Sequence, residues 1–374
     1  MASTTATEQD ARHLQRAIEL AATARGRTSP NPLVGAVVVK DGRTIGEGFH
    51  NAAGEAHAER VALAACGEDP AGATLYVSLE PCCHEGRTPP CTEAILEAGI
   101  ARVVIASEDP TSKAHGRGPA ILRDEGVRVD FLDGQGAHAA RLLNQPFLKH
   151  AQTGRPLVTF KSAMTIDGKV ATSTGDSQWI SGESSRARAH RWRAESDAVA
   201  VGIHTARADD PLLTARVEGV ARQPRRVVFD SEASLPLDSQ LVSSVAEAPV
   251  ILICSRAAGR TGVQALEAAG VEVIVASGGN EAARVESALD ELGDREVQSL
   301  LLEGGPHLAG VFFEAGEIDE VRMFVAPMIV GGRDARAAIE AQGVERIADA
   351  VHAVHVDVER IDDDVLITAR LREW

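Results

Sequence analysis

One short set of residues constrains this chain more than any other: His57-Ala58-Glu59, followed by Pro81-Cys82 and then by Cys91. An imidazole and two thiolates are ligands that zinc takes at catalytic sites, and three protein ligands leave the fourth tetrahedral position for water. Zinc lowers the pKa of that water towards about 7, which makes hydroxide available at neutral pH. The pattern therefore predicts a fold that gathers these three side chains around one metal ion.

Glu59 is not expected to bind the metal, because its position suits proton transfer from the water to a departing amine. Zinc nucleobase deaminases carry the pattern H-x-E … P-C-x-x-C. This chain keeps the first half of that pattern, but eight residues, Cys83–Pro90, separate Cys82 from Cys91. Cys91 is expected to open a helix over 92–98, where the positive end of the helix dipole favours a thiolate.

Two other interpretations of this cluster stay open. In the first, the histidine caps a helix and the cysteines are small buried apolar residues. In the second, the zinc is structural, since closed sites use four protein ligands, and His84 or Cys83 supplies the fourth. Cys83 is expected to be an adjacent bystander, because neighbouring residues rarely both reach one ion.

The length of 374 residues exceeds what one compact core usually holds, so two domains are expected, over 1–150 and 151–374. The boundary is placed between Lys149 and Arg155, where Thr153-Gly154 breaks a helical pattern and Pro156 restarts the chain into a strand. Each half is then large enough to bury a core of its own.

A net charge of −16 argues against nucleic-acid and anionic-membrane binding, which both require basic surface. A small phosphorylated substrate remains compatible, because a few local arginines can hold one phosphate. No apolar stretch reaches the ~18–20 residues of a membrane span, and the polar N-terminus lacks the features of a secretory signal. The chain is therefore expected to be cytoplasmic, and its five cysteines point to metal binding or catalysis rather than to disulfides.

Both halves alternate short apolar runs with helical patterns, which is typical of α/β domains. In the first half, helices are expected over 11–25, 57–66, 92–98 and 137–148, and strands over 34–40, 44–48, 74–79 and 102–106, with a weaker helix and strand ending near Phe131. In the second half, strands are expected near 157–161, 198–201, 226–229, 249–253, 271–275, 299–302, 321–326 and 365–369.

The second half of the sequence, from residue 151 onward, contains weaker signals of a chemical function. Leu302-Glu303-Gly304-Gly305-Pro306-His307 joins an expected strand to an expected helix, and amide groups there suit a cofactor phosphate, although a plain tight turn fits equally well. Arg193 and Arg216 could clamp a substrate phosphate, or they could be ordinary solvated surface. Trp179 could pack on a nicotinamide ring or belong to the core.

With these residues assembled, the first half resembles the deaminase domain of the bifunctional riboflavin-biosynthesis deaminase–reductase family. The resemblance rests on NPLVG at 31–35, GFH at 48–50, AGE at 53–55, HAE at 57–59 and LEPCCHEGRTPPC at 79–91. The last segment is specific to that family. The resemblance implies a cytidine-deaminase-like α/β/α domain, zinc binding by His57, Cys82 and Cys91, and proton transfer by Glu59.

The same resemblance implies that Asn31 and His50 line the pyrimidine pocket and that Asp109 faces the substrate. One region departs from the family pattern, because Asp109-Pro110 is followed by Thr111-Ser112-Lys113 where Asp-Pro-Asn-Pro is expected. Any contact that the expected asparagine makes is therefore in doubt. Cys83 stands where a serine is common, a change that the position beside a ligand should tolerate.

The second half resembles the reductase domain of that family. Its segments KSAMTIDGKV, GDSQWIS, ADDPLLTAR, FDS and EGGPHLAG follow in the expected order between 161 and 310. They imply a dihydrofolate-reductase-like α/β domain rather than a Rossmann module. By resemblance, the NADPH contacts are Ala163, Trp179, Thr205, Asp209, Ser231, Gly305, Pro306, His307, Leu308, Ala309, Gly310 and Val311. The substrate contacts are Ser177, Arg193, Leu213, Arg216 and Glu303, and Lys161 is a catalytic candidate.

The sequence as a whole predicts a bifunctional enzyme of riboflavin biosynthesis that uses Zn²⁺ and NADPH. Its first domain would deaminate 2,5-diamino-6-ribosylamino-4(3H)-pyrimidinone 5′-phosphate, and its second would reduce the ribosyl group to give 5-amino-6-ribitylamino-uracil 5′-phosphate. A homo-oligomer formed through the reductase sheet is expected from the resemblance. The alternatives are another nucleobase deaminase with an appended domain, a non-catalytic zinc-stabilised binding protein, and a chain in which one domain has decayed.

Overall fold

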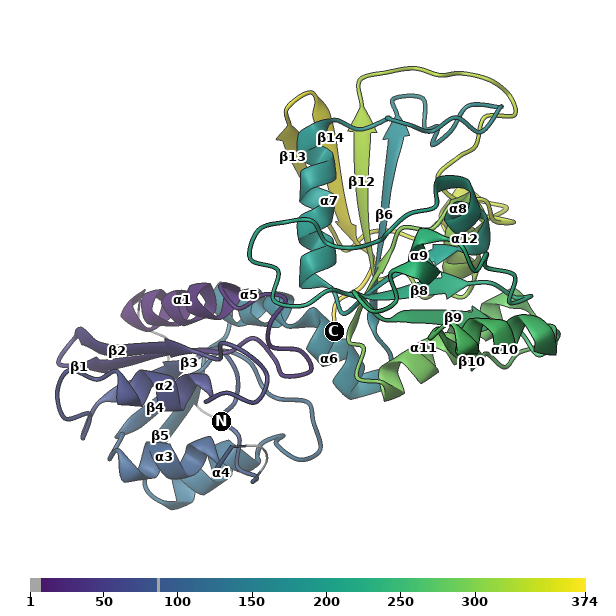
Figure 1. Cartoon of the computed structure of the whole chain (residues 1–374). Coiled ribbons are helices and arrows are strands. Elements are labelled where there is room, and N and C mark those ends of the chain that lie inside the picture. The colour runs from purple at the N-terminus through teal and green to yellow at the C-terminus, as the bar shows by residue number, and fades with distance from the viewer. Residues whose placement is uncertain (1–7, 86–87) are drawn as a thin grey trace. The chain divides into compact units, whose positions relative to one another are not determined.

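The computed structural model describes residues 8–85 and 88–374. The chain divides into two compact units (Figure 1). The N-terminal unit comprises the described residues up to Thr153 together with Trp374, and the C-terminal unit comprises Gly154–Glu373. No helix in the described part of the chain is both long and apolar enough to cross a membrane.

The described residues of the N-terminal unit form a five-stranded sheet in the order β2-β1-β3-β4-β5. Its strands are β1 (Gly35–Lys40), β2 (Arg43–Phe49), β3 (Thr74–Val77), β4 (Arg102–Ile105) and β5 (Arg128–Phe131). β1 is antiparallel to both β2 and β3, whereas β3, β4 and β5 run parallel. The β1–β2 hairpin turns at Asp41-Gly42, both with positive φ, as the sequence predicts.

Helices cover both faces of this sheet and make an α/β/α sandwich. They are α1 (Glu8–Ala22), α2 (Ala58–Ala64), α3 (Cys91–Glu97), α4 (Arg117–Asp124), α5 (Gln135–Leu143) and α6 (Gln145–Thr153). Apolar side chains of α1 and α5 pack on one face, against Val37, Val39 and Val104. Those of α2, α3 and α4 pack on the other, against alternate residues of the same strands, because strand side chains point to opposite faces in turn.

Residues 154–373, all of them described, form a nine-stranded sheet in the order β10-β9-β8-β7-β11-β6-β12-β14-β13. Its strands are β6 (Leu157–Thr165), β7 (Ala198–Gly202), β8 (Arg225–Phe229), β9 (Val250–Cys254), β10 (Glu272–Val275), β11 (Ser299–Leu302), β12 (Glu320–Ala326), β13 (His355–Ile361) and β14 (Asp364–Arg370). The strands from β10 to β12 are parallel, and β14 and β13 complete the sheet in antiparallel fashion.

The parallel part of this sheet is buried between two helical layers. The helices are α7 (Glu183–Glu195), α8 (Ile203–Asp209), α9 (Gln240–Ser243), α10 (Arg260–Ala268), α11 (Glu281–Asp294) and α12 (Pro306–Glu314). α11 and α12 pack on one face, and α7, α8, α9 and α10 pack on the other. The strands read as continuous apolar runs because both of their faces are covered.

Close helix–strand contacts in the N-terminal unit depend on glycines in the hairpin. A Cβ on Gly35 would lie 2.0 Å from the Ala17 carbonyl oxygen in α1, and one on Gly48 would lie 2.4 Å from the Ala62 amide nitrogen in α2. Real Cβ atoms do not approach backbone so closely, so a larger residue would push these helices away from the sheet.

We expect Gly48→Ala to lower the free energy of unfolding by about 1–3 kcal/mol, because α2 must shift to admit the methyl group. Gly67→Ala is the matched control, since a Cβ at Gly67 meets no atom within 4 Å. Chemical denaturation followed by circular dichroism measures both variants. Equal stability of Gly48→Ala and the wild type would contradict the close packing.

Candidate active sites

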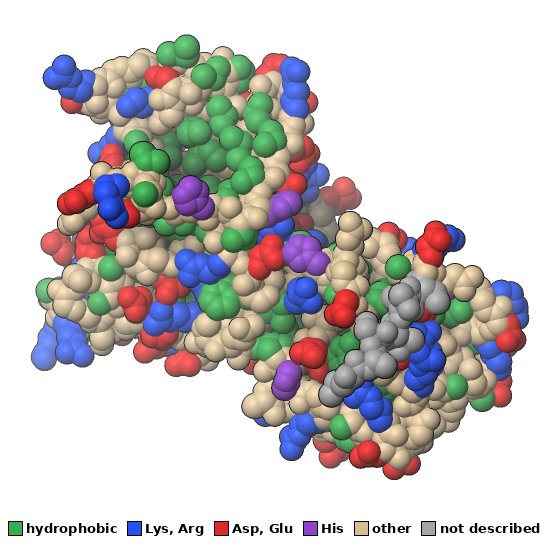
Figure 2. Space-filling model, turned by 180° about the vertical axis from the view of Figure 1, so that it is seen from behind, with side chains coloured by type: hydrophobic (Ala, Val, Ile, Leu, Met, Phe, Trp, Pro, Cys, Tyr) green, Lys and Arg blue, Asp and Glu red, His purple; other side chains and the backbone are tan. Residues whose placement is uncertain are grey.

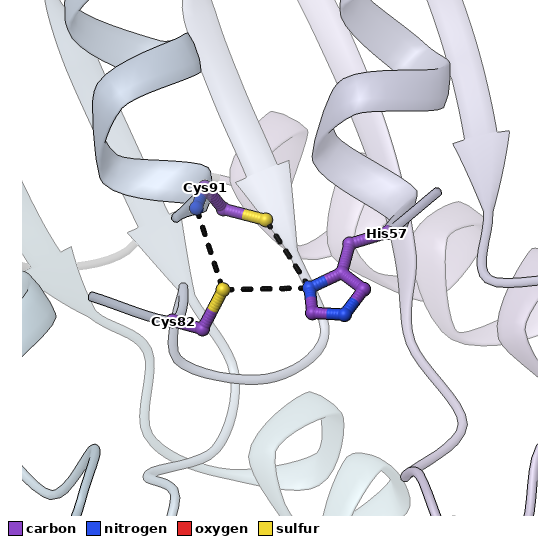
Figure 3. A group of neighbouring side chains, drawn as sticks. All are labelled: His57, Cys82 and Cys91. Carbon is purple, nitrogen blue, oxygen red and sulfur yellow. Dashed lines mark hydrogen bonds between the residues drawn. The ribbon is translucent and has the colours of Figure 1, made fainter. Parts of the chain in front are cut away.

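Three elements bring the metal-ligand candidates of the N-terminal unit together. His57 precedes α2, Cys82 lies in the loop after β3, and Cys91 is the first residue of α3. Nδ1 of His57 lies 3.4 Å from Sγ of Cys82 and 3.4 Å from Sγ of Cys91 (Figure 3). The ligand atoms of the three residues all lie within 4.8 Å of one another.

These donors fit a zinc ion. Usual zinc–sulfur and zinc–nitrogen bond lengths at a tetrahedral angle place the two donor atoms about 3.6 Å apart, close to the observed separations. The other ring nitrogen of His57, Nε2, lies 3.2 Å from Oγ1 of Thr88, which fixes the orientation of the ring. Among the described residues, neither Cys83 nor His84 joins the cluster, and Sγ of Cys83 instead lies 3.8 Å from the Lys113 carbonyl oxygen.

Hydrogen bonds hold the cysteine loop against the two helices. Arg60 of α2 donates from Nη2 to the Pro90 carbonyl at 2.8 Å and from Nε to the Pro89 carbonyl at 3.3 Å. The amide of Thr92 donates to the Cys82 carbonyl at 3.2 Å. The long insertion between the two cysteines therefore ends in a fixed segment that presents Cys91 at the start of α3.

The electrostatics of this cluster favour one thiolate, on Cys82, and a buried carboxyl group that titrates near neutral pH. The hydrogen bond from Cys91 lowers the pKa of Cys82 to about 4, with the His57 contact adding to it, while that same bond and burial raise the pKa of Cys91. Glu59 is buried in the first turn of α2. Burial, and then the negative charge of Cys82, raise the pKa of Glu59 to about 7. The carboxyl group can therefore take up and release a proton near neutral pH.

The two residues expected to line the pyrimidine pocket lie beside the cluster. Nδ2 of Asn31 lies 3.1 Å from Nε2 of His50, and Nδ1 of His50 lies 3.1 Å from the Ala56 carbonyl. The rings of His50 and His57 meet edge to face with centroids 5.3 Å apart. Burial lowers the pKa of His50, so the neutral ring donates to Ala56 from Nδ1 and accepts from Asn31 at Nε2.

Asp109 is buried, and its carboxylate accepts a hydrogen bond from the backbone N–H of Thr111 at 2.8 Å. Burial raises the pKa of Asp109. This backbone hydrogen bond does not depend on the side chain at position 111, so the departure from the family pattern leaves it intact.

The C-terminal unit contains a cavity of about 800 Å³ at the carboxyl ends of β7, β8, β9 and β11. Such ends are where open parallel sheets bind ligands, and the volume is in the range of small-molecule sites. Many of the residues assigned from the sequence line it, namely Lys161, Ala163, Ser177, Trp179, Thr205, Asp209, Ser231, Glu303, Gly305, Pro306, His307, Leu308 and Val311. Trp179 is 67% exposed and the Arg186 guanidinium lies 4.8 Å from its ring centroid, so it is not a core residue.

Two residues expected to contact the cofactor face elsewhere. Ala309 is fully buried in the core, and a Cβ on Gly310 would lie 1.8 Å from the Glu340 carbonyl oxygen. The residues 305–311 form one continuous stretch of sequence, but in α12 successive side chains point in different directions around the helix. Leu213, a predicted substrate contact, is buried in the core beneath α7 and has a φ of 53°.

Glu303 joins two other predicted residues in a buried ion-pair cluster. Its carboxylate accepts from Arg193 Nε at 2.6 Å and Nη2 at 3.0 Å, and Nζ of Lys161 lies 3.6 Å away. Burial opposes ionisation, but the charges of Arg193 and Lys161 outweigh it and bring the pKa of Glu303 to about 2. The Nε and Nη2 groups of Arg193 are thus bonded to Glu303, and are not directed at a substrate as the resemblance implies.

Sequence reasoning missed several residues near this site. Arg186, Arg207 and Arg336 also line the cavity. His190 contacts Arg216, whose Nη2 lies 3.0 Å from His190 Nε2. Isolated arginines and histidines carry no pattern of their own, and only the three-residue spacing of His190 and Arg193 along one helix could have hinted at a shared role.

Comparisons with known proteins agree with both sites. The family model of the cytidine and deoxycytidylate deaminase zinc-binding region matches residues 7–107, and that of the RibD C-terminal domain matches residues 156–367. The riboflavin biosynthesis protein RibD of Actinobacillus pleuropneumoniae is 42% identical over 361 residues, which cover 96% of this chain and 95% of the relative. RibD of Aquifex aeolicus is 40% identical over 96% of this chain and 98% of the relative.

Solved structures give the same result. Acinetobacter baumannii RibD (form 1) is 38% identical, with a TM-score of 0.87 over 97% of this chain and 99% of that one. A diaminohydroxyphosphoribosylaminopyrimidine deaminase/5-amino-6-(5-phosphoribosylamino)uracil reductase from Thermotoga maritima is 36% identical, with a TM-score of 0.84 over 97% and 98% of the two chains.

The fold and sites define a zinc-binding deaminase unit joined to a reductase unit in one chain. The chain belongs to the RibD family of riboflavin-biosynthesis proteins, and it is a bifunctional deaminase and reductase. The predicted fold class, family and enzyme classes are confirmed.

We expect Cys82→Ser and Cys91→Ser to lose zinc and Cys83→Ser to retain it, because only the first two sulfurs face Nδ1 of His57. Inductively coupled plasma mass spectrometry of the purified proteins gives the metal content per chain. Loss of zinc from Cys83→Ser would point instead to a closed structural site with four protein ligands.

Proposed function

We propose that the N-terminal unit hydrolyses the 2-amino group of 2,5-diamino-6-ribosylamino-4(3H)-pyrimidinone 5′-phosphate and releases ammonia. The C-terminal unit then reduces the ribosyl group of the product with NADPH, giving 5-amino-6-ribitylamino-uracil 5′-phosphate. The observation that carries the proposal is the pairing, in one chain, of the His57, Cys82 and Cys91 cluster with a large cavity that contains Lys161 and Glu303. The activities named for the Thermotoga maritima relative support the same pair of reactions.

In the deaminase, His57, Cys82 and Cys91 would hold the zinc ion, which when bound supplies an activated water. Glu59 takes a proton from the attacking water and delivers it to the amino group, so that water adds oxygen to the ring carbon and ammonia leaves. Its raised pKa of about 7 suits both transfers. Asn31 and His50 form a polar pair that can hydrogen-bond to the edge of the pyrimidine.

In the reductase, NADPH would supply a hydride to C1 of the ribosyl chain, opened as an imine or a carbonyl. The ammonium group of Lys161 lies in the cavity and can give a proton to the nitrogen or oxygen that gains charge as C1 is reduced. Glu303 lies 3.6 Å from Lys161 and holds that group in place. Arg193 keeps Glu303 ionised, so its role is to position Glu303.

The cofactor fits the side of the cavity formed by the turn before α12. Gly305 precedes Pro306 at the start of that helix, and free amide groups at a helix start favour a phosphate. A Cβ on Gly305 would lie 3.2 Å from Oγ1 of Thr205, so glycine keeps this wall of the cavity open. Trp179, Asp209 and Ser231 complete the proposed contacts to NADPH.

Product mass tests the proposal directly. With zinc-loaded protein and the diaminopyrimidine phosphate, we expect deamination without NADPH, and deamination followed by reduction when NADPH is added. Glu59→Gln should slow deamination by at least about a hundredfold while it retains zinc, because the amide cannot carry the proton. Lys161→Met should abolish the second mass change and leave the first.

Glu55→Gln is the matched control for the first step, because Glu55 is exposed and bonded to Asn51 rather than to the cluster. The deaminated compound, supplied directly, separates a reductase defect from a missing first step. Turnover of cytosine in place of the diaminopyrimidine phosphate would favour another nucleobase deaminase. Unchanged substrate in the presence of bound zinc would favour a non-catalytic binding protein.

We also propose that the chain forms a homo-oligomer through the open end of its larger sheet. β13 is the edge strand, and Val356 and Val358 on it are 52% and 68% exposed. Ile347, Val351 and Val354, just before the strand, are exposed as well. Figure 2 shows hydrophobic side chains gathered in a hollow of the surface. An edge strand with exposed apolar neighbours is suited to pairing with a second copy.

We expect the double substitution Val356→Glu, Val358→Glu to convert the oligomer to a monomer, because it places charges in the contact. Sedimentation equilibrium measures the mass in solution. Leu237→Glu is the control, since Leu237 is 51% exposed but lies in a different segment, before α9. A monomeric wild type, or an oligomer unaffected by the double substitution, would contradict the proposal.

A further inference from the structure

A histidine outside the cavity holds one of the two arginines that the sequence assigns to the substrate. His190 lies in α7, three residues before Arg193. Its Nε2 lies 3.0 Å from Nη2 of Arg216, and its Nδ1 lies 3.4 Å from the amide nitrogen of Arg216. The ring also forms a hydrogen bond with the Thr214 carbonyl.

The protonation of His190 follows from these contacts. The groups of Arg216 that meet the ring can only donate: Nη2 approaches Nε2, and the backbone N–H donates to Nδ1. Each contact requires a ring nitrogen that carries no proton. A neutral ring has one such nitrogen and a charged imidazolium has none, so only the neutral ring can accept a hydrogen bond from Arg216.

The charges around the ring set Arg216 apart from Arg193. Arg193 is neutralised by its two bonds to Glu303. No carboxylate among the described residues lies within ion-pair distance of Arg216, whose side chain is exposed. Of the two guanidiniums beside His190, Arg216 is therefore the one available to an incoming anion such as a phosphate.

The segment that carries Arg216 is fixed along its length. Gln223 accepts from the Ala215 amide at 2.8 Å and donates to its carbonyl at 3.0 Å. The buried Arg226 donates to the Leu212 carbonyl at 3.3 Å, and Arg193 donates to the Thr214 carbonyl at 3.3 Å. With the backbone held, the direction of the Arg216 side chain depends on its contact with the ring of His190, the one side-chain hydrogen bond that it makes to the described residues.

We propose that His190, in its neutral form, is a positioning residue that aims Arg216 at the 5′-phosphate of the reductase substrate, and that its protonation sets the acid limit of substrate binding. This inference rests on the proposed function, in which Arg216 contacts that substrate. His190 acts through Arg216 and touches no reacting atom.

The electrostatics give the direction of the pH effect. Burial, then the charges of Arg193 and Arg216, lower the pKa of His190, and the charge of Glu303 opposes them. The neutral ring therefore persists below the ordinary titration range of histidine. When the ring does gain a proton it becomes a third cation beside two guanidiniums, loses its acceptor, and releases Arg216.

Two near-isosteric variants separate positioning from bulk structure. His190→Gln keeps an acceptor near the Nε2 position for the Arg216 guanidinium and cannot be protonated. His190→Asn reaches only as far as the Nδ1 position and loses the acceptor at Nε2. Using the deaminated substrate, we expect His190→Asn to raise KM about tenfold with little change in kcat, since one hydrogen bond to a charged group is lost. His190→Gln should restore KM to within about threefold of the wild type.

The pH profile is the readout that a purely structural role would not move. In the wild type, kcat/KM should fall on the acid side through protonation of the substrate phosphate and of His190. In His190→Gln only the protonation of the substrate phosphate should remain, so kcat/KM should fall less steeply as the pH is lowered. Arg191→Gln, an exposed neighbour on the same helix, is the control. KM for NADPH and the thermal unfolding midpoint report whether each variant is folded.

Arg216→Ala distinguishes the failure of this inference from that of the proposed function. If Arg216→Ala leaves the substrate KM unchanged, the assigned phosphate contact is wrong and the inference falls with it. If Arg216→Ala raises KM but the His190 variants, folded by both criteria, keep the KM and pH profile of the wild type, only the role of His190 is overturned.

Discussion

Burial of the Glu303 carboxylate is the constraint on which the C-terminal unit depends. A buried charge without partners costs several kcal/mol, so this position requires cations from elsewhere in the chain. Arg193 supplies two hydrogen bonds from α7, and Lys161 approaches from β6. One carboxylate at the end of the central strand thus fixes a helix on the sheet and aligns the amine proposed for proton transfer. The contacts of Glu303 with Arg193 and Lys161 therefore serve both the packing of α7 on the sheet and the position of the proposed proton donor.

The N-terminal site is built differently, and this explains why the sequence predicts it so well. His57, Cys82 and Cys91 lie within 35 consecutive residues, and their side-chain types restrict the ligand to few metals. The helix starts that present His57 and Cys91 can be recognised from local signals. The departure at Thr111 could not be judged from the sequence, because one of its contacts with Asp109 comes from the backbone N–H, which does not depend on the side chain at that position.

The rest of the C-terminal unit could be predicted only in outline. Its buried strands are visible as apolar runs, but β13 is exposed at every residue except Ile361 and carries no such pattern. Glu303 and Arg193 are 110 residues apart, and no local signal connects them. Ala309 faces the core and Gly310 faces the Glu340 carbonyl, because helical rotation turns both from the cavity, which a continuous motif does not reveal. The contact between His190 and Arg216 likewise depends on tertiary folding alone.

The order of strands in the two sheets has a consequence for synthesis of the chain on the ribosome. The sheet of the N-terminal unit ends with β5, so its last strand is available once residue 131 has emerged. In the C-terminal unit, β11 lies between β6 and β7, and no strand can fill that gap before residue 302. Because parallel pairing across long sequence separations is slow, β6 and β7 wait with unpaired edges through the translation of about a hundred residues. Nascent chains of this enzyme are therefore most exposed to aggregation while their second half is being made.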